Sequence, residues 1–269
     1  MIKSSVSKEI VQYGAQRTTV SDSITVEEPL EIRLEYMDTQ ELRTMMRLAV
    51  TMRTPSDDRD LVRGFLFTEG IIEQFSDIIE IRETGDNIVT IVLDNKVQFD
   101  PTLFQRNFYA SSSCGVCGKA SIESIQHETI FLPWKSKFTI ASSKLMKLPD
   151  DLRQRQVTFM QTGGIHACAL YDKDGQFLAI AEDVGRHTAM DKLIGSQSSM
   201  PIHDTMVIVS GRASFELVQK ASRAGIGLFA AIGAPSSLAV DLATEQGMTL
   251  IGFLKSDKFN CYNREDRIV

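Results

Sequence analysis

Apolar and charged side chains alternate along residues 30–36, where aliphatic residues and a tyrosine are separated by glutamate and arginine. A period of two residues is typical of a strand with one buried face, so we expect a half-buried strand here. The apolar run at 88–93 predicts a second strand. Residues 1 to about 24 are polar, which indicates a poorly ordered tail or an edge strand.

A helix is expected after Thr54, which can cap it, while Pro55 suits the first helical position. Two aspartates follow and would face the positive end of the helix dipole. Leucine, valine and phenylalanine at positions 61, 62, 65 and 66 form an apolar face, and Gly70 suits the helix end. We therefore expect a small α+β region within residues 25–110.

The second half of the chain alternates between strand and helix patterns. The expected elements are strands at 167–171 and 177–180 around a turn at 172–175, a helix at 183–194, a strand at 206–209, a helix at 214–224, a strand at 226–232, a helix at 237–246 and a strand at 248–254. Gly225 and Gly247 suit helix ends. Leu238 and Leu242 are expected to face inward.

This alternation predicts an α/β fold with right-handed crossovers and a mostly parallel mixed sheet that helices cover, to which the hairpin adds antiparallel character. Ligands of such sheets bind at the loops that follow the carboxyl ends of parallel strands. Three segments fall at such positions: Ser210-Gly211-Arg212, Gly233-Ala234-Pro235 and the stretch after Phe253.

Composition limits the function further. The 269 residues are 43% apolar and 24% charged, which is ordinary for a globular protein. A formal net charge of −6 argues against a broad nucleic-acid surface, which needs excess lysine and arginine. No apolar run could span a bilayer, and the first residues lack an apolar signal core. We therefore expect a cytoplasmic protein without membrane contact.

The sharpest chemical feature is Cys114-Gly115-Val116-Cys117, in a stretch rich in serine and glycine. Two thiolates can hold half a zinc site, a dithiol can cycle through a disulfide, and one thiolate can carry a persulfide. The stretch predicts a mobile loop, which suits a carrier that must reach both a donor and an acceptor. The pattern by itself leaves zinc, redox and carrier chemistry open.

Spacing weakens the first two alternatives. His127 follows Cys117 with no second histidine within reach, unlike a zinc finger, although remote His166 or His187 could complete a site. No strand leads closely into the motif, unlike a thioredoxin-type site. The other cysteines, Cys168 and Cys261, fit small buried hydrophobic residues.

Two further clusters could contact an anionic ligand or be purely structural. In Thr162-Gly163-Gly164-Ile165-His166, paired glycines allow close backbone approach to a ligand, or form a tight turn beside a core histidine, which the residues alone favour. In Glu182-Asp183-Val184-Gly185-Arg186-His187, Asp183 could pair with the edge of a guanine base or cap a helix. Basic residues could offset the acidic balance locally, since Arg212 lies beside a helix start. They are Arg186, Lys192, Arg212, Lys255 and Lys258.

Taken in order, these motifs resemble the formate dehydrogenase accessory sulfurtransferase family, called FdhD. The resemblance covers residues 25–262. The matching segments are Ser113-Cys-Gly-Val-Cys-Gly118, Thr162-Gly-Gly-Ile-His166, Glu182-Asp-Val-Gly-Arg-His187 with Asp191-Lys-Leu-Ile-Gly195, Ser210-Gly-Arg212 and Gly247-Met-Thr-Leu-Ile-Gly-Phe253. Each motif is weak alone, but the ordered set is specific.

The resemblance implies a catalytic domain of cytidine-deaminase-like fold and a homodimer. It implies that sulfur comes from a cysteine desulfurase and passes to the bis-molybdopterin guanine dinucleotide cofactor of molybdenum, which formate dehydrogenase needs for activity. Cys114 matches the persulfide position and Cys117 the second cysteine. It also implies no permanently bound metal. The domain division expected is a tail and small α+β region at 1–110, a loop at 111–136 and an α/β cofactor-binding domain at 137–269.

Residues and resemblance together predict a set of cofactor contacts. The set is Thr162, Gly163, Gly164, His166, Asp183, Gly185, Arg186, His187, Lys192, Ser210, Gly211, Arg212, Phe253, Leu254, Lys255, Ser256, Asp257 and Lys258. Many relatives carry arginines where this chain has Lys255 and Lys258, and lysine lacks the fork that grips phosphate in two places. Many also carry alanine at position 168, where a thiol near His166 could be a further sulfur or metal ligand, although packing is expected.

Two rival functions come from other classes. A zinc-dependent deaminase uses an H-x-E motif followed by P-C-x-x-C, but here the CxxC precedes His166, and Cys168 stands where glutamate is needed. A non-catalytic chaperone would escort the molybdenum cofactor without needing its thiols. A redox-regulated binding module is a more distant alternative.

Overall fold

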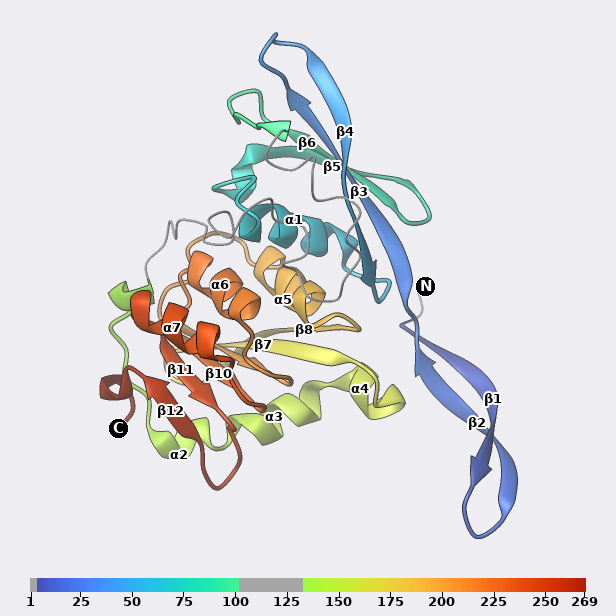
Figure 1. Ribbon diagram of the computed structural model, residues 1–269, viewed down its shortest axis with the longest axis vertical. Helices are drawn as coiled ribbons and strands as arrows, with labels where there is room; N and C mark the ends of the chain where they lie inside the picture. Colours follow the sequence, from blue (N-terminus) through green and yellow to red (C-terminus); the bar gives the residue numbers. More distant parts are fainter. Residues whose placement is uncertain (1–3, 102–132) are drawn as a thin grey trace.

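The computed structural model describes residues 4–101 and 133–269 of the chain. Figure 1 shows three parts: a projecting hairpin, a four-stranded sheet, and a larger six-stranded sheet with helices on both faces. Cys114, Cys117 and most of the predicted loop at 111–136 lie outside the described residues.

The N-terminal residues form a hairpin rather than a poorly ordered tail or an edge strand. Strand β1 (Ser5–Tyr13) pairs antiparallel with β2 (Arg17–Thr25) along their full length. We call residues 5–25 the arm, and Figure 1 shows it extending away from both sheets. Its polar composition suggested a tail because the arm builds a hydrogen-bonded ladder without contributing to a core.

The four-stranded sheet has the order β4-β3-β6-β5. Strands β3 (Glu28–Met37) and β6 (Ile88–Leu93) confirm the two strands predicted from sequence, and they pair in parallel. Strands β4 (Arg43–Arg53) and β5 (Ile78–Gly85) add antiparallel edges that the sequence pattern did not predict.

Helix α1 (Asp58–Thr68) confirms the predicted helix, and Gly70 adopts a left-handed φ of 79° just after it. The predicted cap is wrong. The hydroxyl of Thr54 accepts the amide of Val184 at 3.2 Å instead, and Asp57 is the capping residue, with a φ of 54° and no side-chain cap bond. Thr54 lies before the helix, where its hydroxyl connects the N-terminal half of the chain to Val184 in the C-terminal half.

The six-stranded sheet has the order β12-β11-β10-β9-β7-β8. Its strands are β7 (His166–Asp172), β8 (Phe177–Asp183), β9 (Thr205–Val209), β10 (Leu228–Ala231), β11 (Thr249–Gly252) and β12 (Asn260–Asn263). Only β9-β10 and β10-β11 are parallel, and the other three pairings are antiparallel. The sheet is therefore mixed, as expected, but it is not mostly parallel, because the expected hairpin and an antiparallel edge flank the parallel centre.

Helices cover both faces of this sheet, as Figure 1 shows. One face carries α5 (Arg186–Gly195), α6 (Phe215–Arg223) and α7 (Ser237–Glu245), and the other carries α2 (Ser142–Leu145), α3 (Leu148–Arg155) and α4 (Val157–Thr162). Short 3-10 helices lie at Phe75–Asp77, Pro133–Lys135 and Glu265–Arg267. Leu242 is buried as expected, but Leu238 is 61% exposed, which corrects its inward assignment.

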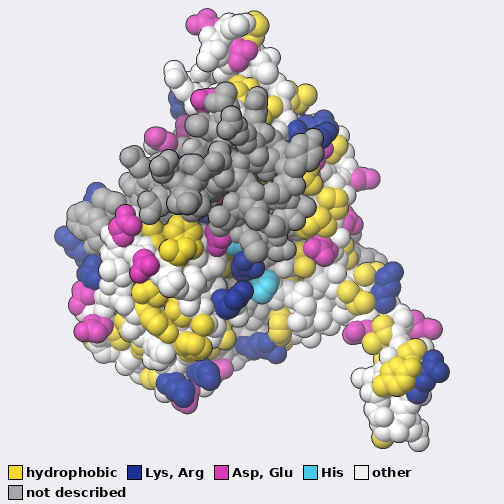
Figure 2. All heavy atoms as spheres, viewed as in Figure 1, with side chains coloured by type: hydrophobic (Ala, Val, Ile, Leu, Met, Phe, Trp, Pro, Cys, Tyr) yellow, Lys and Arg dark blue, Asp and Glu magenta, His cyan; other side chains and the backbone are white. Residues whose placement is uncertain are grey.

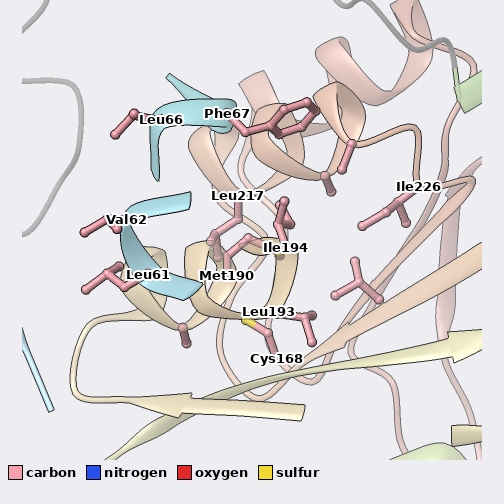
Figure 3. Packing of buried hydrophobic residues seen from close by; sticks show 14 of the residues in the cluster. Leu61, Val62, Leu66, Phe67, Cys168, Met190, Leu193, Ile194, Leu217 and Ile226 are labelled. Atoms are coloured by element: carbon pink, nitrogen blue, oxygen red, sulfur yellow. The ribbon is translucent and has the colours of Figure 1, made fainter. Parts of the chain in front are cut away.

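Helix α1 lies between the two sheets, so both share one hydrophobic cluster. Figure 3 shows Leu61 and Val62 on the side of α1 away from α5, and Phe67 directed toward α6. The helices α1 and α5 cross at glycines: a Cβ on Gly64 would overlap the carbonyl oxygen of Asp191, and one on Gly195 would overlap that of Asp60. Backbone contact at this crossing fixes the four-stranded sheet against the larger one.

A buried charge cluster reinforces the same junction. The ammonium of Lys220 on α6 lies 2.9 Å from Asp191 of α5, 2.8 Å from the hydroxyl of Thr68 and 3.0 Å from Glu69. Three helices thus meet at one cation, which partners the buried Asp191 carboxylate. Within residues 4–101 and 133–269, no helix has the length and apolar character needed to cross a membrane.

Candidate functional site

Three loops at the carboxyl ends of the parallel strands lie side by side, as expected from the sequence. The amide of Gly233 donates to the carbonyl of Gly211 at 2.9 Å, and the amide of Phe253 donates to the carbonyl of Gly233 at 3.0 Å. The loops after β9, β10 and β11 therefore form one continuous edge. Side chains from all three can meet a single ligand there.

Small residues allow this close contact. A Cβ on Gly233 would lie 3.0 Å from the Gly211 carbonyl oxygen and 3.1 Å from Arg212 Cγ. A Cβ on Gly252 would lie 2.7 Å from Cδ of Pro235. Larger side chains at either glycine would push the loops apart, so these positions hold the edge together.

His166 brings β7 to the same edge. Its Nδ1 lies 3.5 Å from where a Cβ on Gly211 would be, so the half-buried imidazole lies against that loop. Burial lowers the pKa of His166, and the nearby charges of Arg186 and His187 lower it further, while Asp183 opposes them. The ring is therefore neutral over more of the pH range than a free histidine, and it can either donate or accept a hydrogen bond.

Cationic groups surround this edge. Arg186 is half-buried at the start of α5, and Arg212 is exposed in the loop after β9. Neither guanidinium has a hydrogen bond or ion pair within the residues that the structure describes, and the exposed ammonium groups of Lys255 and Lys258 have none there either. Figure 2 shows histidine and basic side chains gathered near the middle of the displayed face. Such groups can hold an anion such as a phosphate.

The segment after β11 presents a side chain to solvent at this edge. Phe253 is 42% exposed and has a left-handed φ of 52°, which is unusual for a residue of its size. Leu254 is buried, and its amide donates to the carbonyl of Ala231 at 3.0 Å. Ser256 and Asp257 are exposed. The anchored Leu254 thus holds Phe253 and the following polar residues outward.

His187 follows Arg186 and faces a carboxylate that no sequence motif indicates. Its Nε2 lies 3.8 Å from Oε2 of Glu216, in the first turn of α6. Both side chains are mostly buried, and Nε2 has no hydrogen-bond partner within the described residues. No motif spacing pointed to Glu216, because it becomes a neighbour only when α5 and α6 pack together.

Asp183 and Lys192 differ from the other predicted contacts because both are fully buried. Their side chains form an ion pair of 2.8 Å. Asp183 also accepts the amides of Gly185 at 2.8 Å and Thr54 at 3.1 Å, and Lys192 donates to the Thr54 carbonyl at 2.8 Å. With every charged atom engaged and unexposed, the pair fixes Thr54 to the larger sheet, and the predicted edge contact between Asp183 and guanine finds no accessible atom.

Several other predicted contacts have structural partners. Gly163 ends α4 with a φ of 67°, and Gly164 donates its amide to the hydroxyl of Thr162. The Ser210 hydroxyl accepts the amide of Ala167 at 2.9 Å. A Cβ on Gly185 would overlap the hydroxyl of Thr188. These residues shape the turns around His166, and only Gly163 and Gly164 are exposed.

A further carboxylate next to this site supports the neighbouring helix. Glu182 accepts the amides of Thr158 at 2.8 Å and Phe159 at 2.9 Å, which satisfies the first turn of α4. The sequence placed Glu182 before a helix, but the helix that it caps is an earlier one. Sequence spacing could not show which of the two helices Glu182 caps.

The two described cysteines are structural. Cys168 is completely buried on β7, beneath Leu193 of α5 in Figure 3, and burial raises the pKa of its thiol. Cys261 is half-buried, and its thiol donates to the carbonyl of Asn263 at 3.3 Å. Within the parts of the chain that the structure describes, no three His, Cys, Asp or Glu side chains converge as metal ligands.

Comparison with known proteins gives consistent matches over nearly the whole chain. The model of the FdhD/NarQ family matches residues 25–269. The chain is 46% identical to the sulfur carrier protein FdhD of Mycolicibacterium paratuberculosis, with 92% of each chain covered. It is 41% identical to that of Picrophilus torridus, with 98% of each chain covered. The crystal structure of a candidate formate dehydrogenase accessory protein from Desulfotalea psychrophila has the same fold, with a TM-score of 0.78 at 23% identity, covering 99% of this chain and 100% of that one.

Proposed function

The chain belongs to the FdhD/NarQ family, and we propose from this membership that it is a sulfur carrier in the maturation of formate dehydrogenase. The observation that carries the proposal is the 46% identity, over 92% of both chains, to a relative named as a sulfur carrier protein. Identity at this level over the full length supports a shared activity rather than a shared fold alone.

In the first step that we propose, the Cys114 thiolate attacks the terminal sulfur of a persulfide on a cysteine desulfurase. A sulfur–sulfur bond forms to Cys114 as the bond within the donor breaks, and the desulfurase cysteine leaves as a thiolate. The product is a persulfide on Cys114, and no external oxidant is needed because one sulfur simply changes partners. In this sense the protein acts as a sulfurtransferase, with Cys117 as the second cysteine of the motif.

The acceptor that we propose is the bis-molybdopterin guanine dinucleotide form of the molybdenum cofactor, bound as a substrate. The cationic edge supports this choice, because the dinucleotide tails carry phosphates and Arg186 and Arg212 have no other described partner. His166 can add a hydrogen bond, and the segment from Phe253 to Lys258 can contact the guanine end. Asp183 and Lys192 would then act as positioning residues beneath the site.

We extend the proposal to the setting in which the protein works. It acts in the cytoplasm as a homodimer, it serves formate dehydrogenase, and its larger sheet is of the cytidine-deaminase-like type. The mixed sheet flanked by helices on both faces is compatible with that fold class. Binding of the tails supplies orientation for sulfur transfer, since a fixed acceptor raises the effective concentration of the reacting groups.

The test is sulfur loading followed by intact-protein mass spectrometry. The wild type, incubated with a cysteine desulfurase and cysteine, is expected to gain the mass of one sulfur atom, which a reductant then removes. Cys114→Ala is expected to lose this gain completely. Cys261→Ala provides the matched control, because its half-buried thiol on β12 is engaged with the carbonyl of Asn263, and it should load as the wild type does.

Other outcomes would favour the rival functions. A stably bound zinc with no sulfur gain in the wild type would overturn the carrier mechanism and favour a deaminase-like hydrolase. Normal activation of formate dehydrogenase by Cys114→Ala would instead favour a chaperone that escorts the cofactor without using the thiol. The two outcomes can be told apart, because mass spectrometry measures the bound zinc and sulfur, whereas the activation assay measures formate oxidation.

A further inference from the structure

The arm carries an aliphatic face that no other part of the described chain covers. Val6 pairs with Ile24, and Ile10 pairs with Val20, across the two strands. Residues opposite each other in a hairpin share a face, so the four side chains lie together. Val6 is 39% exposed and Ile24 is 42% exposed. None of the four packs against either buried cluster of the described residues.

The opposite face of the arm is polar at its base, where it turns toward the rest of the molecule, and carries the exposed Val11 and Tyr13 only toward the tip. It carries Ser7 and Ser21, whose hydroxyls are hydrogen bonded to each other, and Thr25. The hydroxyl of Thr25 donates to that of Thr162 on α4 at 2.8 Å. Since Ile24 has the opposite orientation to Thr25 along the strand, the aliphatic face points away from α4.

A row of opposite charges separates the two aliphatic rows. Lys8 pairs with Asp22 between the Val6 row and the Ile10 row, and both side chains are exposed. Asp22 accepts the amide of its neighbour Ser23 at 2.9 Å, and no ion pair joins Lys8 to Asp22 within the described residues. Along the strands, this face therefore has an aliphatic row, a charged row and a second aliphatic row.

We propose that this face is covered by the same face of a second copy of the chain, with the two-fold axis parallel to the strands. The inference rests on the proposed homodimer and gives it an interface. A half-turn about this axis exchanges β1 and β2, so each row meets the same row of the other arm. Val6 then contacts Ile24 of the partner subunit, and Lys8 faces Asp22 of the partner subunit.

The charge row selects this axis. An axis across the strands would also match the aliphatic rows, but it would place Lys8 against Lys8 and Asp22 against Asp22. Like charges directly opposite each other are destabilising. Only the axis along the strands makes both the apolar and the charged rows complementary.

The size of the face sets the expected strength of the contact. Each strand has nine residues, which gives a face of roughly 30 by 10 Å. Two such faces bury on the order of 600 Å², a little over a third of the roughly 1,600 Å² of a standard interface, so the contact is a weak one. An isolated two-stranded hairpin is only marginally stable in water, so association would also stabilise the arm. A contact this small should respond strongly to single substitutions.

The test exchanges charges between subunits and follows the full chain by analytical ultracentrifugation. Lys8→Asp and Asp22→Lys each place like charges across the proposed axis, so each variant alone should dimerise at least about tenfold more weakly than the wild type. An equimolar mixture of the two variants should recover the dimer, because the new carboxylate at position 8 then faces the new ammonium at position 22. Glu9→Lys, on the opposite face of the arm, is the control and should dimerise like the wild type.

Recovery in the mixture can arise only between chains, because like charges still face each other within each variant arm. A mixture as monomeric as the separate variants would overturn the proposal, as would variants that dimerise like the wild type. A wild type that stays monomeric would overturn the homodimer as well. Sulfur loading on Cys114, measured on the same samples, distinguishes any of these results from a failure of the carrier function.

Discussion

Glu216 and His187 show how a neighbouring pair can set a charge at the site. Burial alone would raise the pKa of Glu216, but contacts with His187, its own backbone amide and Ser214 hold it at about 2. The carboxylate is therefore ionised throughout the physiological range. It lies 3.8 Å from His187, the residue after Arg186.

Replacing Glu216 by glutamine should destabilise the protein in a pH-dependent way. A folded-state pKa of about 2, below the ordinary 4.5, contributes stability that is complete above pH 4.5 and is lost as the pH falls toward 2. We expect Glu216→Gln to be less stable than the wild type by about 1–3 kcal/mol at neutral pH. Urea unfolding at a series of pH values should show this difference shrinking below pH 4.5.

The exposed Glu245 at the end of α7 provides the control for that series. Glu245→Gln should follow the wild type at every pH, since an exposed carboxylate gains little from folding. A difference between Glu216→Gln and the wild type that stays constant with pH would mean that the lost carboxylate charge is not its cause.

Residue identity alone could suggest a site but not the role of each member. Asp183 follows a strand and precedes a cationic helix, which fits either a ligand contact or a structural ion pair. The choice depends on Thr54, which lies 129 positions away along the chain and donates its amide to Asp183. Local spacing does not indicate partners so distant in sequence. The burial of the Asp183–Lys192 ion pair could therefore not be predicted.

At the scale of elements, the crossing of α1 and α5 depends on two missing side chains. Gly64 and Gly195 each lie against a backbone carbonyl of the other helix. Glycine is unfavourable inside a helix by about 1 kcal/mol relative to alanine, so the close approach must offset that cost. Backbone contact also brings Lys220 within reach of Asp191 and Thr68.

Gly64→Ala is therefore expected to destabilise the protein despite its better helix propensity. The new Cβ would overlap the Asp191 carbonyl oxygen, and overpacking of this kind costs about 1–3 kcal/mol. Thermal unfolding should show a lower midpoint than in the wild type. Gly14→Ala, at the tip of the arm with nothing within 4 Å of the added Cβ, should leave the midpoint unchanged. An unchanged midpoint for Gly64→Ala would show that the helices can separate without loss.

Elements with a regular period were predictable, and those shaped by irregular pairing were not. Strand β3 alternates cleanly and was predicted. Its neighbour β4 was missed, because a register shift between Ile32 and Arg33 breaks the pairing and β4 is an edge strand of mixed exposure. Leu238 was assigned inward from helical spacing, but α7 turns it to solvent. A periodic pattern indicates a face, and the packing partner decides which face is buried.

At the scale of the whole molecule, an acidic protein presents a locally basic edge. The formal net charge is −6, yet Arg186, Arg212, Lys255 and Lys258 flank the three loops without described anionic partners. The place of Arg212, Lys255 and Lys258 was predictable, because they follow β9 and β11 and the carboxyl ends of neighbouring parallel strands share an edge, whereas Arg186 follows β8, which pairs antiparallel with β7. The arm and the antiparallel edge strand β12 were not predicted, because their residues are mostly polar and carry no clear apolar pattern.

Guanosine diphosphate is a suitable probe of this edge. Arg186→Gln and Arg212→Gln should each weaken its binding by about tenfold, which corresponds to about 1.4 kcal/mol, because each removes a charge-assisted contact to phosphate. Isothermal titration calorimetry at two salt concentrations should also show weaker binding at the higher one.

Lys144→Gln serves as the control, because this exposed lysine lies on α2, on the opposite face of the large sheet. It should bind the nucleotide like the wild type. Equal affinities for Arg186→Gln, Arg212→Gln and this control would place the phosphate site elsewhere on the molecule.

The position of α1 between the two sheets constrains how this chain can be recombined with its relatives. The N-terminal sheet reaches the larger one through glycine crossings, a buried lysine and the Thr54 junction, all of which need matching residues on both sides. A chimera joined between the two sheets would separate these matched surfaces and expose apolar area on each half. In chimeras built from this chain and its relatives, α1, α5 and α6 should therefore all come from the same parent protein.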